Sequence, residues 1–251
     1  MSASVTLERD GRVATLILDR PPLNILDLAT LARLGECLES LADDPPQLLW
    51  LRGGERAFSA GVAVEDHTPE RVPAMLRGVR TAIGALMDLP SVSIAVVEGH
   101  CLGGGLELAA ACDMVLATDG ASFGQPEIEV GCFPPVAAAL FPARLGSART
   151  MELLLTGRTI DAAEAERLGL VTWRVEAARL ESEIERLTAL LLARSAAVTP
   201  LLKRAVGAGA TLPTDRALAE TERIYLEELS ETEDIKEGGA GLMARGERGC
   251  K

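Results

Sequence analysis

The sequence predicts an α/β fold with helices on both faces of the sheet, and three observations predict it. Short apolar runs alternate with helical patterns along most of the chain. These runs are almost continuously apolar, which is typical of strands buried on both faces. A chain of 251 residues, 48% of them hydrophobic, is long enough to bury one large core. Because aromatic residues make up only 3%, that core must consist mainly of Leu, Val, Ile and Ala.

The first elements of the chain alternate in this way. Residues 5–8 and 13–18 flank a turn at residues 9–12 and predict a β-hairpin. Leucines at helical spacing predict a helix over residues 28–41, which ends before the helix-breaking segment 43–46. After this helix the pattern predicts, in order, a strand over 48–51, a helix over 73–89, a strand over 92–97, a helix over 106–112 and a strand over 114–117.

Helical patterns dominate the chain from Ala162 onward. Residues 159–164 have the pattern of a capped helix start, and this helix should end near Gly169. Amphipathic spacing predicts two further helices, over residues 180–194 and 215–229. No linker rich in Gly or Ser separates this region from the rest. We therefore expect a core over residues 1–195 and a helical segment over residues 196–251 that packs on the core or on a neighbouring subunit.

Charge and composition argue against several classes of protein. A net charge of −12 with only three lysines disfavours nucleic acid, RNA included, as a partner, because phosphate backbones require a basic surface. The N-terminus lacks the basic region of a signal peptide, and the apolar stretches are shorter than the roughly 18 residues of a membrane span. We expect a cytoplasmic protein without a membrane partner. The cysteines form no C-x-x-C pair and only two histidines are present, so no zinc site is predicted; reduced, mostly buried thiols are expected at Cys37, Cys101, Cys112, Cys132 and Cys250.

Two glycine-containing loops each follow a predicted buried strand. The first spans residues 58–61 and the second residues 99–107, where three consecutive glycines open a helix. Such a helix start leaves backbone N–H groups without partners, and two N–H groups from separate loops can hold one oxygen, as in an oxyanion hole. Ordinary turns are the alternative for either loop alone. Neither loop has the pattern of a phosphate-binding motif.

Two glutamates stand in apolar surroundings close to these loops. Glu107 lies in the apolar run 106–111 directly after the glycines, and Glu127 follows residues 123–126. Burial raises the pKa of a carboxyl group toward neutrality, where a general acid or base works best. For Glu107 an interaction with the helix dipole is the competing explanation. Two donor loops combined with two carboxylates are far more specific than any of these parts alone.

Taken together, these residues resemble the crotonase (enoyl-CoA hydratase/isomerase) superfamily over nearly the whole chain. The segments that carry the resemblance are residues 58–61, 98–109, 112–113, 123–128, 155–158, 163–171 and 237–238. The resemblance implies a spiral of ββα units, which here would form the catalytic and acyl-CoA-binding core, followed by C-terminal helices. It also implies a homotrimer or a dimer of trimers. The ligand would be an acyl-CoA thioester, with no cofactor besides the coenzyme A that belongs to the substrate.

The resemblance also implies roles for individual residues. The backbone N–H groups of Ala60 and Gly104 would hold the thioester oxygen. Glu107 would activate water, and Glu127 would exchange a proton with the α- or γ-carbon. Arg245 aligns with a basic residue that can reach the phosphates of coenzyme A across a subunit boundary. Further substrate contacts are expected at Ser59, Gly61, Val62, Val64, Gly103, Phe133 and Pro134.

The chain departs from the usual family pattern at two places. Ala63 stands where the family often has Asp, and residues 132–140 (CFPPVAAAL) replace a glycine-rich segment that lines the acyl pocket. Residues 133–138 and 65–70 are similar instead to cyclohexa-1,5-diene-1-carbonyl-CoA hydratases. The two prolines at 134 and 135 predict a rigid apolar wall that suits a flat ring. His67 lies either at a ligand entrance or in a surface loop.

The resemblance therefore implies a lyase that adds water to an α,β-unsaturated CoA thioester, with a cyclic dienoyl group as one candidate. Both glutamates are present, and water addition needs a base for the water and an acid for the carbon. An enoyl-CoA double-bond isomerase is the alternative if Glu107 proves dispensable. A protein of another class that binds acyl-CoA without turnover is the third possibility, because fold does not determine function.

Overall fold

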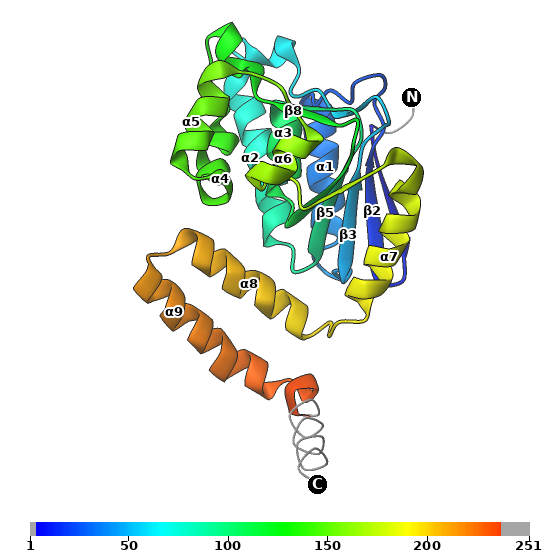
Figure 1. Cartoon of the computed structure of the whole chain (residues 1–251), viewed down its shortest axis with the longest axis vertical. Helices are drawn as coiled ribbons and strands as arrows, with labels where there is room; N and C mark the ends of the chain where they lie inside the picture. Colours follow the sequence, from blue (N-terminus) through cyan, green and yellow to red (C-terminus); the bar gives the residue numbers. More distant parts are fainter. Residues whose placement is uncertain (1–3, 237–251) are drawn as a thin grey trace. The chain divides into compact units, whose positions relative to one another are not determined.

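A computed structural model describes residues 4–236 of the chain (Figure 1). Its strands are β1 (Val5–Asp10), β2 (Val13–Leu18), β3 (Leu48–Arg52), β4 (Ala57–Ser59), β5 (Val92–Val97), β6 (His100–Leu102), β7 (Met114–Thr118), β8 (Ser122–Gly124), β9 (Ile160–Asp161) and β10 (Trp173–Val175). Its α-helices are α1 (Leu28–Ser40), α2 (Val72–Asp88), α3 (Gly104–Ala111), α4 (Pro135–Leu145), α5 (Ser147–Thr156), α6 (Ala162–Leu168), α7 (Leu180–Leu192), α8 (Val198–Thr211) and α9 (Thr214–Arg223). Short helical turns are η1 (Val64–His67), η2 (Pro126–Val130), η3 (Ala177–Arg179), η4 (Ile224–Glu228) and η5 (Leu229–Glu231).

The larger sheet has the strand order β1-β2-β3-β5-β7-β10. The predicted hairpin is confirmed, since β1 and β2 pair antiparallel from Val5 opposite Leu18 to Asp10 opposite Val13. All the other neighbours in this sheet pair in parallel. The three predicted apolar strands are thus its central members, which explains why their sequences are apolar without alternation.

Both faces of this sheet are covered, as β3 shows. Leu49 and Leu51 belong to the core cluster that also contains apolar residues of α1 and α2. Trp50 points to the opposite face, where its indole N–H donates to Thr188 Oγ1 of α7 at 3.1 Å. Alternate side chains of one strand therefore enter two separate apolar layers.

The smaller sheet, with the order β4-β6-β8-β9, carries the loops of interest. Each of its first three strands follows directly on a strand of the larger sheet, so that β3–β4, β5–β6 and β7–β8 are successive pairs. Each pair leads into a helix: α2, α3 and, after the turn η2, α4. This repeat is the predicted spiral of ββα units.

The helices agree with the prediction in part. α1, α2, α3, α6 and α7 lie where they were predicted. The Asp27 side chain caps α1 by accepting from the Thr30 N–H at 2.8 Å, a local signal typical of a helix start. α4, α5 and α8 were not predicted as helices. The predicted helix over residues 215–229 is divided between α9 and the π-helical turn η4.

The chain forms two compact units, Met1–Thr188 and Ala189–Lys251, the second described as far as residue 236. The division between these units falls within α7. The boundary after residue 195 between a catalytic core and a helical segment stays a prediction. The first unit contains both sheets and every residue of the candidate site that the structure describes. Among the described residues, no helix combines the length and the apolar character that a membrane crossing requires.

Candidate active site

The two glycine loops approach each other so closely that side chains are excluded between them. A β-carbon built on Gly104 would lie 2.6 Å from Val62 Cγ2 and 3.5 Å from the Val62 nitrogen. A β-carbon on Gly105 would lie 2.5 Å from the Ser59 carbonyl oxygen. Gly61 adopts φ +101, a conformation that glycine adopts without strain, and the Leu102 carbonyl lies across from it. The glycines therefore serve to bring two backbone segments into contact.

Two backbone N–H groups are left free where these loops meet. Leu26 pairs with the first loop by donating to the Gly61 carbonyl at 2.9 Å and by accepting from the Ala63 N–H at 3.2 Å. This parallel bridge turns the Val62 N–H away from Leu26, and no acceptor takes it within the described chain. The Gly104 N–H, at the start of α3, likewise has no acceptor among residues 4–236. These two N–H groups form the donor pair of a candidate oxyanion hole.

The prediction that Ala60 supplies one of these donors is wrong. The Ala60 N–H donates to the Leu23 carbonyl at 2.9 Å and is already engaged. Asn24 helps to fix the same segment, because its side-chain amide donates to the Ala57 and Phe58 carbonyls at 3.0 and 3.2 Å. The free donor lies two residues later, at Val62, which the sequence had indicated as a substrate contact.

Glu107 lies in the first turn of α3 and is almost fully buried, with 4% of its surface exposed. Its Oε1 accepts from the Ala137 N–H, in the first turn of α4, at 2.8 Å. Burial raises the pKa of Glu107 to about 7, the charge of Glu127 adds to the rise, and the N–H groups of Ala137 and Val136 oppose it. The predicted burial of Glu107 is confirmed, and this burial is the main cause of its raised pKa.

Glu127 lies in the turn η2, between β8 and α4, and its carboxylate lies against the second loop. A β-carbon built on Gly103 would lie 2.7 Å from Glu127 Oε1, so only glycine leaves room for the carboxylate here. Burial raises the pKa of Glu127 as well. The side-chain amide of Gln125, 1% exposed, lies against the Glu127 carboxylate; in the amide orientation that satisfies both groups, its NH₂ group donates to Glu127 Oε2 at 3.0 Å and to Oε1 at 3.2 Å.

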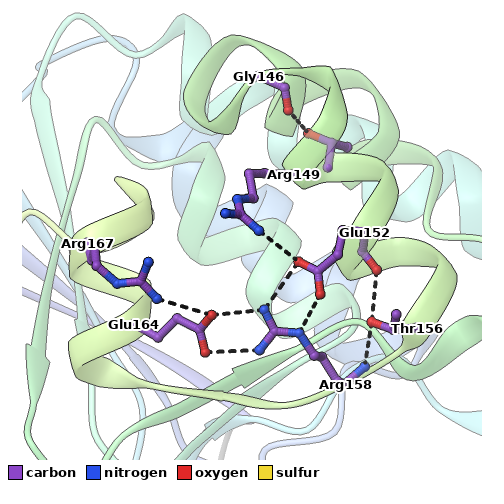
Figure 2. Close-up of polar contacts among 8 residues, drawn as sticks. Gly146, Arg149, Glu152, Thr156, Arg158, Glu164 and Arg167 are labelled. Atoms are coloured by element: carbon purple, nitrogen blue, oxygen red, sulfur yellow. Dashed lines mark hydrogen bonds and ion pairs between the residues drawn. The ribbon is translucent and has the colours of Figure 1, made fainter.

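An ion-pair network joins α5, α6 and the loop between them (Figure 2). The Arg158 guanidinium lies between Glu152 of α5 and Glu164 of α6, with Nε to Glu152 Oε1 at 2.5 Å and Nη1 to Glu164 Oε2 at 2.9 Å. Because Arg158 lies in the loop between α5 and α6, these ion pairs fix that loop to both helices. In that loop Gly157 packs against Ile128 and Glu129 of η2, so the turn that carries Glu127 rests on a fixed surface.

The remaining residues predicted to contact the substrate differ in how exposed they are. Ser59 has no exposed surface, and its hydroxyl accepts from the Gly61 N–H at 3.2 Å, so both residues serve the structure of the loop rather than contact a ligand through these groups. Val64 is 81% and Phe133 68% exposed. Pro134 is buried and precedes the first residue of α4. Arg245 lies outside the described residues.

The sequence did not indicate the roles that Gln125 and the backbone N–H groups of Val62 and Ala137 have in the site. Gln125 appeared only as a member of a motif, although a buried amide next to a glutamate is a signal that could have been used. The N–H groups of Val62 and Ala137 carry no sequence signal, because what leaves them available is tertiary structure. His67 lies in η1, with its Nδ1 3.0 Å from the Ala63 carbonyl, and no side chain of the site touches it in any hydrogen bond of the described region.

Chemically, this arrangement combines two features. The free N–H groups of Val62 and Gly104 can stabilise negative charge on one oxygen, and two carboxyl groups with raised pKa values can accept and donate protons beside it. Together they suit reactions in which an enolate-like oxyanion forms while protons move at neighbouring carbon and oxygen atoms.

Comparison with known proteins gives one consistent family. A sequence model described as "Enoyl-CoA hydratase/isomerase" matches residues 8–248. The chain is 37% identical to the cyclohexa-1,5-dienecarbonyl-CoA hydratase of Thauera aromatica, with 93% of this chain and 91% of that protein covered. It is 34% identical to a probable enoyl-CoA hydratase of Mycobacterium bovis, with 96% and 95% covered. Among solved structures, it is similar to an enoyl-CoA hydratase of Mycobacterium smegmatis, with a TM-score of 0.90, 28% identity and 96% of each chain covered.

Proposed function

Because this chain belongs to the enoyl-CoA hydratase/isomerase family, we propose that it adds water to the double bond of an α,β-unsaturated acyl-CoA thioester. One observation supports this function above the others. Glu107 is buried and Glu127 half-buried, the two carboxyl groups interact electrostatically, and they stand beside two backbone N–H groups that have no acceptor among residues 4–236. Isomerisation needs one group that moves a proton between carbons, whereas water addition uses both carboxyl groups.

The proposed reaction assigns a role to each group. The thioester oxygen accepts hydrogen bonds from the Val62 and Gly104 N–H groups. Glu107, ionised, takes a proton from water as the water oxygen bonds to the β-carbon, and the electrons of the double bond pass to the thioester oxygen. The resulting enolate is stabilised by the two N–H groups. Glu127, protonated, then gives its proton to the α-carbon, and transfer of the proton from Glu107 to Glu127 restores the starting state.

For the acyl group we propose a ring-bearing substrate such as a cyclic dienoyl thioester. The similarity to the hydratase of Thauera aromatica supports this choice. Pro135 occupies the first position of α4 and follows the buried Pro134, which gives the segment after Glu127 a fixed backbone. A rigid wall excludes long chains more strongly than the about 1–3 kcal/mol that each missing methylene contributes to binding.

We also propose assembly as a homotrimer or a dimer of trimers. Large apolar side chains are exposed on the second unit, among them Leu202, Val206, Leu218, Tyr225 and Leu226, each at least 54% exposed. Exposed apolar surface of this kind is typical of protein interfaces. Light scattering on the purified protein tests the assembly, and a monomer at micromolar concentration would contradict it.

The substitution Glu107→Gln tests the function most sharply, because it separates hydration from proton exchange at carbon. We expect hydration to fall by a factor of about 10²–10⁴, with some exchange of the α-proton retained in deuterated buffer. Glu129→Gln, in the same turn as Glu127 but on an exposed residue, is the matched control and should keep wild-type activity.

Two results would contradict the proposal. If isomerisation of a 3-enoyl thioester is the fast wild-type reaction and survives Glu107→Gln, the protein is an isomerase. If the wild-type protein binds acyl-CoA esters but turns over none of a panel of enoyl thioesters, it is a binding protein.

A further inference from the structure

Helices α3 and α4 are joined at both ends by hydrogen bonds that involve active-site elements. At one end, Glu107 of α3 accepts from the Ala137 N–H of α4 at 2.8 Å. At the other end, Arg144 of α4 donates to the Cys112 carbonyl, which follows the last residue of α3, at 2.5 Å. The two helices therefore run side by side in the same direction. α3 carries both the Gly104 N–H and the Glu107 carboxylate. The position of α4 relative to α3 therefore affects how the Glu107 carboxylate is held.

The sequence makes the start of α4 a donor site for an anion. Pro135 is the first helical residue and has no N–H group, and the Pro134 carbonyl accepts the first helical bond, from the Ala138 N–H at 3.0 Å. No side chain caps this helix in the way that Asp27 caps α1. The Val136 and Ala137 N–H groups are thus the unpaired donors of the first turn, at the positive end of the helix dipole. Glu107 takes the place of the missing cap.

This contact makes the two oxygens of Glu107 unequal. Oε1 is held by Ala137, whereas Oε2 accepts no hydrogen bond from residues 4–236 and is not among their buried, unpaired polar atoms. Oε2 is therefore not fully enclosed by protein atoms. Ala137 and Phe141, one helical turn apart, have no exposed surface and anchor α4 in the core. A donor fixed in this way cannot follow the carboxylate if the carboxylate rotates.

We propose that the first turn of α4 is a positioning element of the active site: its Ala137 N–H fixes Oε1 of Glu107 and leaves Oε2 as the oxygen that receives the proton of water. The inference rests on the proposed hydratase function. Pro135 acts as a positioning residue, because it sets where the helix begins without itself offering a donor. The charged group that acts on Glu107 is Glu127 of η2, whereas Arg144 lies at the opposite end of the helix pair.

The test removes the N–H group and leaves the side chain unchanged. Replacing Ala137 by the corresponding α-hydroxy acid through ligation converts its amide into an ester. Loss of a hydrogen bond to the ionised carboxylate raises the pKa of Glu107, so the acidic limb of the kcat/KM profile should move up by about one pH unit. We expect kcat at the plateau to fall about tenfold, while the dissociation constant of a saturated acyl-CoA stays unchanged.

The matched control is the same chemical change at Gly146. Its N–H donates to the Pro142 carbonyl at 3.0 Å, at the far end of α4. This ester removes one helix hydrogen bond, which the Ala137 ester does not, and it should leave the pH profile in place. A second variant, Pro135→Gly, alters an exposed residue and loosens the first turn; it should move the acidic limb in the same direction by a smaller amount.

An Ala137 ester that folds, binds acyl-CoA and keeps the wild-type pH profile and kcat would overturn the inference. Equal shifts from the Ala137 and Gly146 esters would also overturn it, since the effect would then come from helix stability. If Glu107→Gln itself leaves hydration intact, the proposed function fails instead, so the two failures are distinguishable.

Discussion

Gly103→Ala tests whether the space around Glu127 is as tight as the structure indicates. The β-carbon added at Gly103 would lie 2.7 Å from Glu127 Oε1, whereas ordinary contacts begin near 3.4 Å. The carboxylate must therefore withdraw by about 0.7 Å or rotate away. Either movement disturbs the hydrogen bonds from Gln125 and the alignment of the proton donor with the α-carbon. Misplacement of a catalytic group by about 1 Å costs on the order of 10² in rate.

The substitution also strains the backbone, and this effect needs its own control. Gly103 adopts φ +52, where a side chain costs of order 1–3 kcal/mol. Gly146 adopts φ +76, and a β-carbon there would meet nothing within 4 Å. Gly146→Ala should therefore lower the free energy of unfolding by a similar amount without a collision. The comparison separates strain from displacement of the carboxylate.

Steady-state hydration kinetics and urea denaturation of both variants provide the assay. We expect kcat to fall by about 10² in Gly103→Ala with KM changed only a few-fold, and to stay near wild type in Gly146→Ala. A Gly103→Ala enzyme with wild-type kcat would show that Glu127 has room to spare, and the reasoning from this contact would be refuted.

Three further predictions concern pH, stability and substrate. Because the pKa of Glu107 is raised to about 7 and its ionised form is the proposed base, kcat/KM should fall as the pH drops through about 7; a profile that is flat there would contradict this role. Phe141→Ala, at a residue without exposed surface, should lower the free energy of unfolding by about 3–5 kcal/mol in urea denaturation, and a loss below about 1 kcal/mol would show that the core tolerates the cavity. In side-by-side assays, kcat/KM should be higher for a cyclic dienoyl-CoA than for crotonyl-CoA and very low for chains of eight or more carbons; a preference for straight chains would reject the ring-bearing substrate and leave the glutamate mechanism intact.

The larger sheet could be predicted because its strands are buried on both faces. Residues 92–97, for example, form an unbroken run of small and apolar residues, and the structure gives a strand with the same bounds, β5. The crotonase fold predicted from the resemblance is confirmed by the family match and by solved structures of the same fold. The short strands of the smaller sheet, such as β9 with two residues, contain too few residues for any periodicity to be visible.

The unpredicted helices have identifiable causes. α4 begins with proline and contains Pro142, so its sequence resembles a rigid loop more than a helix. α8 contains Pro200, Gly207 and Gly209, which obscure its helical pattern. In α4 the first proline in fact marks the helix start, because the first position requires no N–H donor.

The two carboxylates of the site could be predicted from the sequence, but its backbone N–H donors could not. Glu107 and Glu127 stand out because a charged residue in an apolar run calls for an explanation. Which N–H group is free depends on how the loop 58–63 pairs with Leu23 and Leu26, and this pairing is tertiary. For that reason Ala60 was the wrong donor, although the loop itself was correctly selected.

The central claim is that Glu127 supplies the proton in the addition of water to an enoyl-CoA thioester. The most direct measurement compares hydration by the wild-type enzyme and by Glu127→Gln, together with the dissociation constant of a saturated acyl-CoA for each. The account predicts that the substitution lowers kcat for hydration by a factor of about 10² or more and leaves the dissociation constant nearly unchanged. Near-wild-type turnover in Glu127→Gln would contradict it.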